Sequence, residues 1–204
     1  MDEKKNLLEV VLGLRTCENR KSTLSLSLQN ARDCSGFRQC VPYTRKEFDL
    51  RHQGLRTDDE ADMFCALMNY LVVLEQIGTL FYKGRIIEAL KESGMPLKQR
   101  CALNGLRNAL AHHGGLAIWD EHKHKGYKFI VDFNDSADIV KLSSIVWNGD
   151  YSDKSEETST TIYAISLIQL VENIVKHLSE KLTDFVDKCT LSQEEIATKF
   201  TILT

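Results

Sequence analysis

The sequence contains little that would interrupt the chain or cross-link it. Only two of its 204 residues are proline, Pro42 and Pro96, and no internal repeat or low-complexity tract is evident. Its six cysteines form no CxxC pair, which argues against a disulfide framework in a chain of this length. We therefore expect reduced thiols and a single domain over residues 1–204 that buries one hydrophobic core.

The sequence also shows no obvious signal for a membrane or for export. We find no apolar run that indicates a membrane span. The N-terminus, MDEKKNLLEVVLG, is acidic and lacks the pattern of a signal peptide. These absences predict a soluble, cytoplasmic protein with no membrane partner.

An excess of positive charge is missing as well. The chain has 26 Lys and Arg against 29 Asp and Glu, a net charge of −3 that argues against a general nucleic-acid binder. The charge is unevenly spread, because residues 83–128 hold nine basic and four acidic residues, together with four of the six histidines. This local excess is compatible with an anion site and equally with ordinary mixed surface charge.

Helical periodicity is the main pattern that the sequence does contain. Residues 58–82 carry apolar side chains at steps of three and four, which is typical of one buried helix face. Gly114 and Gly115 are suitable C-cap residues for a second helix. Further helical segments are expected over 85–93, 97–113, 160–187 and, after a capping box that begins at Ser192, in the last residues of the chain.

Two β-rich segments interrupt this pattern. YKFIVDF (127–133) and IVKLSSIVW (139–147) are separated by NDSAD and are predicted to pair as a hairpin. The N-terminal residues 1–56 are the least informative, since LLEVVLGL fits a helix or a strand and STLSLSLQ alternates like a strand. The expected fold class is therefore mainly α: an antiparallel helical bundle with core helices in 57–115 and 160–187, an N-terminal extension, and a small β-hairpin excursion.

The stretch NGLRNALAHHGG (104–115) carries polar side chains at the end of an apolar helix. At about 100° per residue, Asn104, Arg107, Asn108 and His112 share one polar sector, whereas His113 points toward the apolar side. The spacing therefore favours His112 over His113 as the exposed imidazole.

RNALAHH resembles the Arg–Asn–three residues–His signature of HEPN domains, helical bundles that often act as metal-independent ribonucleases. The amphipathic segment MNYLVVLEQIGTLFY before it is also similar to that family. The resemblance covers about residues 60–115 and the helix at 160–187. It implies that Arg107 and His112 are catalytic and that Asn108 supports them, with Asn104 and His113 as weaker candidates. It implies no metal and no cofactor.

The residue types suit RNA cleavage by attack of a ribose 2′-hydroxyl on the neighbouring phosphate. An imidazole serves as base or acid, and a guanidinium offers forked donors to phosphate oxygens. Dependence on the 2′-hydroxyl would restrict the substrate to RNA. HEPN ribonucleases are typically dimers with the motifs facing across a two-fold axis, so the resemblance implies a homodimer with a composite site.

The resemblance also implies a role as a toxin or defence effector, with an antitoxin or regulatory protein as a further partner. Some HEPN toxins carry a tyrosine, two residues after the histidine, that a partner enzyme modifies. Gly114 occupies that position here. We therefore do not expect this chain to be silenced by that modification.

Three other interpretations stay open. The chain could be a catalytically silent HEPN-like module that binds nucleotides or proteins. It could be a plain helical scaffold, in which Arg107 pairs with a carboxylate such as Glu75 and the histidines place cations at a helix C-terminus. It could also be a zinc protein. The candidate zinc ligands are His112, His113, His122, His124 and Asp120.

Overall fold

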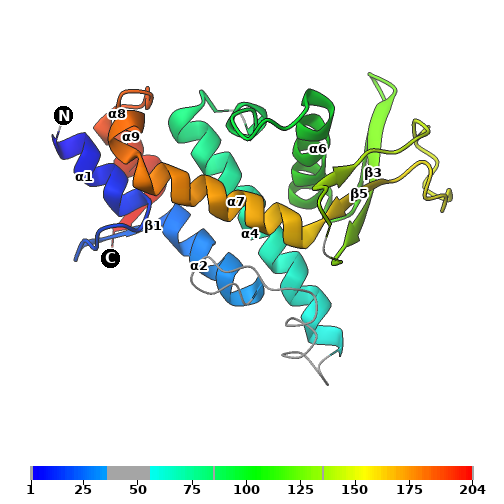
Figure 1. Ribbon diagram of the computed structural model, residues 1–204, viewed down its shortest axis with the longest axis horizontal. Coiled ribbons are helices and arrows are strands. Elements are labelled where there is room, and N and C mark those ends of the chain that lie inside the picture. Colours follow the sequence, from blue (N-terminus) through cyan, green and yellow to red (C-terminus); the bar gives the residue numbers. More distant parts are fainter. Residues whose placement is uncertain (1, 36–55, 85, 135, 204) are drawn as a thin grey trace.

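The computed structural model describes residues 2–35, 56–84, 86–134 and 136–203 (Figure 1). Among these residues, helices and strands are mixed in eight helices and six strands. The helices are α1 (Asp2–Val11), α2 (Thr23–Ser35), α4 (Arg56–Phe81), α5 (Ile86–Ala89), α6 (Leu97–His113), α7 (Ala164–Glu180), α8 (Leu182–Val186) and α9 (Gln193–Phe200). The strands are β1 (Arg20–Ser22), β2 (Ala117–Asp120), β3 (Lys125–Asp132), β4 (Val140–Lys141), β5 (Thr160–Tyr163) and β6 (Thr201–Leu203).

The expectation of a mainly α bundle is therefore wrong, and the fold is a mixture of α and β. The strands form a two-stranded sheet, β1–β6, and a four-stranded sheet in the order β2-β3-β5-β4. Most of these strands have only two to four residues. A period of two is hard to recognise over so few positions, which is why the sequence pattern underestimated them.

Helix α4 is the central element of the core. Leu67, Leu74 and Ile77 on its buried face are fully shielded from solvent, as the sequence period predicts. The segment Asp62–Phe81 is long and apolar enough to cross a membrane by length and composition, which corrects the expectation that no such run exists. More than half of this segment is buried inside the protein, so its apolar character is explained by its place in the core of a soluble fold.

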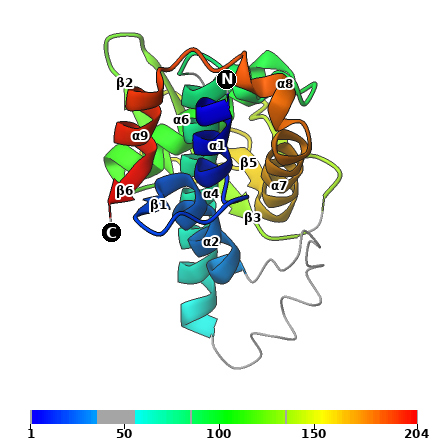
Figure 2. The ribbon, with the colours of Figure 1, turned by 90° about the vertical axis from the view of Figure 1, so that its left-hand side faces the viewer.

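The N-terminal elements belong to the same core and are not a separate extension. Leu24, Leu28 and Ala31 of α2 recur at steps of four and three and are buried in the cluster that α4 forms. The prediction of a strand for STLSLSLQ is therefore wrong, and Ser22 starts the helix by accepting a hydrogen bond from the Ser25 amide at 3.0 Å. Figure 2 views the end of the molecule that carries α1 and α9, and Figure 1 shows α2 extending from there toward the middle. The rest of the expected extension, residues 36–55, lies outside the described residues.

The four-stranded sheet corrects the predicted hairpin. Strand β3 forms a hairpin with β2, which precedes it, and on its other side it pairs in parallel with β5. The segment 139–147, expected to pair with β3, contributes only β4, which lies antiparallel to β5. The predicted helix over 160–187 is likewise wrong at its start, where β5 lies, and it is divided at Lys181 into α7 and α8.

The caps predicted for two helices are confirmed. Gly114 ends α6 in the left-handed region, at φ +60°, and its amide donates to the Ala109 carbonyl. Ser192 begins α9 with a capping box in which Glu195 is the reciprocal partner. The helix expected over 85–93 is shorter than predicted, because α5 ends at Ala89.

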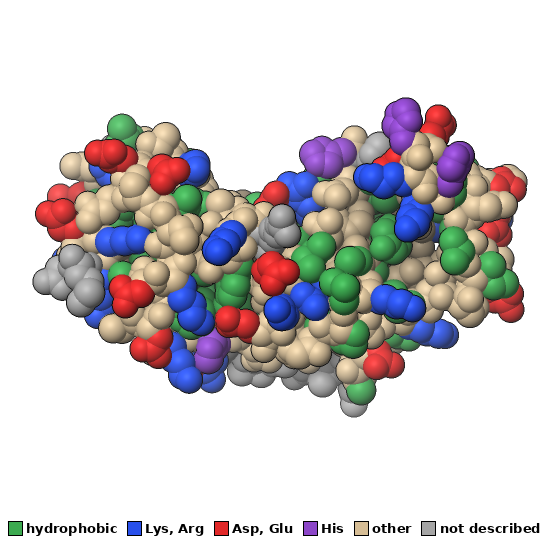
Figure 3. All heavy atoms as spheres, turned by 90° about the horizontal axis from the view of Figure 1, so that it is seen from above, with side chains coloured by type: hydrophobic (Ala, Val, Ile, Leu, Met, Phe, Trp, Pro, Cys, Tyr) green, Lys and Arg blue, Asp and Glu red, His purple; other side chains and the backbone are tan. Residues whose placement is uncertain are grey.

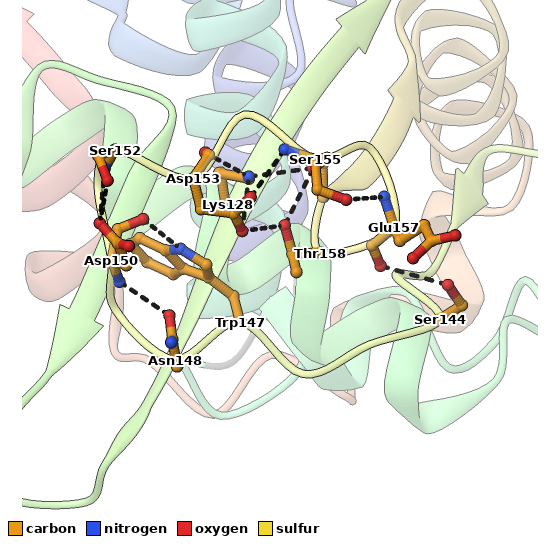
Figure 4. Close-up of polar contacts among 11 residues, drawn as sticks. Lys128, Ser144, Trp147, Asn148, Asp150, Ser152, Asp153, Ser155, Glu157 and Thr158 are labelled. Carbon is orange, nitrogen blue, oxygen red and sulfur yellow. Dashed lines mark hydrogen bonds and ion pairs between the residues drawn. The ribbon is translucent and has the colours of Figure 1, made fainter.

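A long loop between β4 and β5 is held against the sheet by Lys128 of β3 (Figure 4). The ammonium donates to the main-chain oxygens of Asp153 at 2.8 Å and Ser155 at 3.1 Å. It also lies 3.3 Å from the Asp153 carboxylate. Trp147 of the same loop is buried and donates from Nε1 to the Asp150 carbonyl at 3.0 Å. The Lys128 ammonium therefore fixes the acidic loop to β3.

Candidate active site at the end of helix α6

Helix α6 presents opposite faces to the core and to solvent. Leu103, Leu106 and Ala109 are fully buried and fix the helix against the core. Gly105 lies so close to β3 that a Cβ built on it would come within 2.7 Å of the Tyr127 ring. Because the apolar side is held in this way, the polar residues of the motif are directed to the opposite side.

Arg107 is the centre of the polar face. Its Nε and Nη2 donate to Glu75 Oε2 of α4, with a distance of 2.9 Å for Nε. Its Nη1 donates to Asn108 Oδ1 at 3.0 Å. The ion pair with Glu75, which the scaffold interpretation predicts, is thus present, and it orients the guanidinium.

His112 completes the cluster. Its side chain is exposed, and its Nε2 lies 3.2 Å from Arg107 Nη1. A guanidinium can only donate, so a hydrogen bond between these two atoms requires Nε2 to be the acceptor. The shared face of Arg107, Asn108 and His112 is confirmed by these contacts, while their catalytic roles stay predictions.

Two further candidates from the sequence have different positions. His113 is the last residue of α6, and its side chain lies outside the described part of the structure. Asn104, one turn before Asn108, lines a pocket together with Arg107. It therefore lies beside the motif, on the side away from His112.

The pocket has a volume of about 300 Å³. Its walls come from the end of α4, the turn after it, α5 and α6. The lining residues are Glu75, Gly84, Ile86, Ile87, Asn104 and Arg107. The sequence indicated a helix for the α5 segment, but it gave no signal that Ile86 and Ile87 would face the motif.

A zinc site is not favoured by this arrangement. His122 and His124 lie on the exposed turn between β2 and β3, where Asp120 pairs with Lys123 at 3.0 Å. Among the residues that the structure describes, no three His, Cys, Asp or Glu side chains group as metal ligands. In Figure 3, histidine and basic side chains lie near one another over the end of the molecule that carries α6 and the sheet.

Comparisons with known proteins add no relative to this picture. Protein-family models, curated proteins and solved structures were each searched, and none of them matches the chain. The resemblance to HEPN domains therefore depends on the sequence alone, on the motif of residues 104–115 and the amphipathic segment before it, and stays a prediction.

Proposed function

We propose that this protein is a metal-independent endoribonuclease that cleaves RNA through attack of a ribose 2′-hydroxyl on the adjacent phosphate. The observation that carries the proposal is the position of Arg107 Nη1, which contacts both Asn108 Oδ1 at 3.0 Å and His112 Nε2 at 3.2 Å. A forked cation and an acid–base side chain therefore lie within hydrogen-bond distance of each other. These are the groups that phosphoryl transfer by the 2′-hydroxyl needs.

In this proposal, Arg107 binds the phosphate and stabilises the charge that develops on it. Glu75 holds the guanidinium through Nε and Nη2, so Nη1 keeps a fixed direction toward the exposed end of α6. When RNA binds, a phosphate oxygen replaces His112 Nε2 as the partner of Nη1, and the imidazole is released. A donor that is oriented before the substrate arrives needs little rearrangement in the transition state.

His112 then serves as the base. Its Nε2 takes the proton of the 2′-hydroxyl while O2′ forms a bond to phosphorus. The bond from phosphorus to the 5′-oxygen breaks, and that oxygen takes a proton from a second imidazole. The products are a 2′,3′-cyclic phosphate and a 5′-hydroxyl, so no water and no metal enters the cleavage step.

The second imidazole is assigned to a second copy of the chain. Among the described side chains, His112 is the one imidazole with a hydrogen-bond contact to Arg107. A homodimer in which two α6 ends face each other would supply the missing acid. The site would then be composite, and activity would depend on dimer formation.

The test is cleavage of a mixed-sequence single-stranded RNA in the presence of EDTA. Wild-type protein should cut the RNA and leave cyclic phosphate ends, and the DNA of the same sequence should stay intact. His112→Ala should lower the rate by about 10²–10⁴-fold. Arg107→Lys, which keeps the charge and loses the fork, should lower it by about 10²-fold or more.

Two histidine variants serve as matched controls. His122→Ala removes an exposed imidazole on the β2–β3 turn and should leave the rate unchanged. His113→Ala should also leave it largely intact, because the helical spacing directs that residue toward the apolar side. Loss of cleavage on chelation of metals, or a His112→Ala rate equal to wild type, would contradict the proposal. RNA or nucleotide binding without cleavage would favour the silent binding module instead.

We further propose that the protein acts in the cytoplasm as a toxin or defence effector, and that an antitoxin or regulatory protein restrains its activity. Expression of the wild-type chain should then arrest bacterial growth, and expression of His112→Ala at the same level should not. Specific activity should fall when the protein is diluted below its dimer dissociation constant. Activity that is independent of concentration would contradict the composite site.

A further inference from the structure

The pocket beside Arg107 continues from the motif along α6. Asn104 precedes Asn108 by one turn, and Asn104 and Arg107 both line the pocket. A helix rises about 12 Å between Asn104 and His112, with Arg107 between them. An RNA strand with its phosphate at Arg107 would therefore have a neighbouring base within reach of this pocket.

Two polar groups of the pocket have unused hydrogen-bonding capacity. The two hydrogen bonds that Arg107 makes to Glu75 both end on Oε2, and Glu75 Oε1 accepts no hydrogen bond from the described residues. The Asn104 side-chain amide, which carries a donor and an acceptor, likewise makes no hydrogen bond within the described chain. A ligand in the pocket would meet a carboxylate acceptor and an amide from two different helices.

The remaining walls suit a flat ring. Ile86 and Ile87 supply apolar surface from α5, and Gly84 adds no side chain that would fill the space. A pocket of about 300 Å³ falls at the lower end of the range of ligand sites, large enough for a single base. Apolar walls with a few placed polar groups are the usual composition of a small-molecule site.

We propose that this pocket binds the base next to the scissile phosphate and selects adenine, an inference that rests on the proposed function. The exocyclic amino group of adenine would donate to Glu75 Oε1, and the Asn104 amide would pair with the adjacent ring edge, as asparagine does with adenine elsewhere. In the orientation proposed for adenine, hypoxanthine, guanine and uracil place a carbonyl oxygen against Glu75, and the carboxylate repels it. Guanine has a second edge, N1–H with the 2-amino group, that can donate to a carboxylate, so the comparison of adenine with hypoxanthine is the one that tests the contact at the 6-position. Cytosine has the amino group but a smaller ring, so it ranks second.

The first arm of the test measures cleavage. Oligonucleotides with one ribose among deoxyriboses fix the cleaved bond, and the base on either side is varied among adenine, hypoxanthine, guanine, cytosine and uracil. Adenine should exceed hypoxanthine by about tenfold or more in kcat/KM, since they differ in one hydrogen bond to a charged group. Glu75→Gln, whose amide can donate to a carbonyl oxygen, should bring this ratio toward one, and Asn104→Ala should lower kcat/KM for the adenine substrate. The matched control, Asn69→Ala, removes a helical asparagine that bonds the Cys65 carbonyl and should preserve the ratio.

The second arm measures binding without chemistry. Adenosine and inosine 5′-monophosphates are titrated calorimetrically into His112→Ala, which keeps every residue that lines the pocket. Adenosine monophosphate should bind about tenfold more tightly, and equal affinities would overturn the inference. A wild-type protein that leaves RNA intact but prefers adenosine monophosphate would refute the ribonuclease and support the pocket. A protein that cleaves RNA with no preference for adenine over hypoxanthine would support the ribonuclease and refute the pocket.

Discussion

Glu172 should be the most sensitive polar position of the core. It lies on α7, is 3% exposed, and accepts hydrogen bonds from Arg32 Nε at 2.8 Å and Nη2 at 2.7 Å and from the Tyr70 hydroxyl at 2.9 Å. Burial and then the Glu172 charge raise the pKa of Tyr70, so the hydroxyl keeps its proton and remains a donor. One carboxylate thus joins α2, α4 and α7.

Glu172→Gln retains the shape of the side chain but removes its charge and replaces one acceptor by a donor. Breaking a buried pair from one side costs ~3–5 kcal/mol. We expect a decrease of about 3 kcal/mol in the free energy of unfolding, at the lower end of this range, because the Arg32 side chain retains 30% exposure. In urea unfolding followed by circular dichroism, a slope of about 3 kcal/mol per molar would convert this loss into a midpoint lower by about 1 M.

Glu180→Gln is the matched control for this measurement. Glu180 lies on the same helix, but its partner Lys176 is 3.9 Å away and the two side chains are 61% and 59% exposed. Its replacement should change the free energy of unfolding by less than about 0.5 kcal/mol. Equal midpoints for the two variants would refute the reasoning that burial makes the Glu172 pair important.

Two further predictions concern the sheet and its loop. Gly105→Ala would place a methyl carbon 2.7 Å from Tyr127 Cδ2. This clash should outweigh a gain in helix propensity of about 1 kcal/mol and lower the free energy of unfolding by about 1–2 kcal/mol, so unchanged urea stability would contradict the close packing. Hydrogen bonds from the Thr158 hydroxyl and then from the main chain hold the pKa of Asp153 below its usual 3.8. The ionised Asp153 carboxylate therefore stabilises the loop fully above pH 3.8, and this stabilisation is lost as the pH falls through the lowered pKa. Tryptophan fluorescence should therefore change only below pH 3.8. The Asp153→Asn variant should show the low-pH spectrum already at neutral pH. A native spectrum in that variant would exclude this role for the carboxylate.

The parts of the site that sequence could predict are those that depend on local periodicity. The helical spacing placed Arg107, Asn108 and His112 on one face, and the contacts of Nη1 confirm it. Gly114 marked the end of the helix correctly because a left-handed C-cap favours glycine. Glu75 was a plausible partner because a surface arginine near a carboxylate commonly pairs with it.

The parts that sequence could not predict depend on contacts between distant segments. Phe129 of β3 pairs with Thr160 of β5, and nothing in either short segment specifies that register. The serine and leucine alternation of α2 suits a strand locally, but packing of Leu24 and Leu28 against α4 favours the helix. The pocket was missed for the same reason, because α5 reaches the motif only through tertiary packing.

The position of β3 has a consequence for the nascent chain. The ribosome releases α6, β2 and β3 well before β5, so one edge of β3 lacks its neighbour until residues 160–163 emerge. An uncovered strand edge is a place where chains associate with one another. A fragment that ends before residue 160 would therefore carry the whole motif on an unfinished support, and translation pauses in that interval should make the protein prone to aggregate.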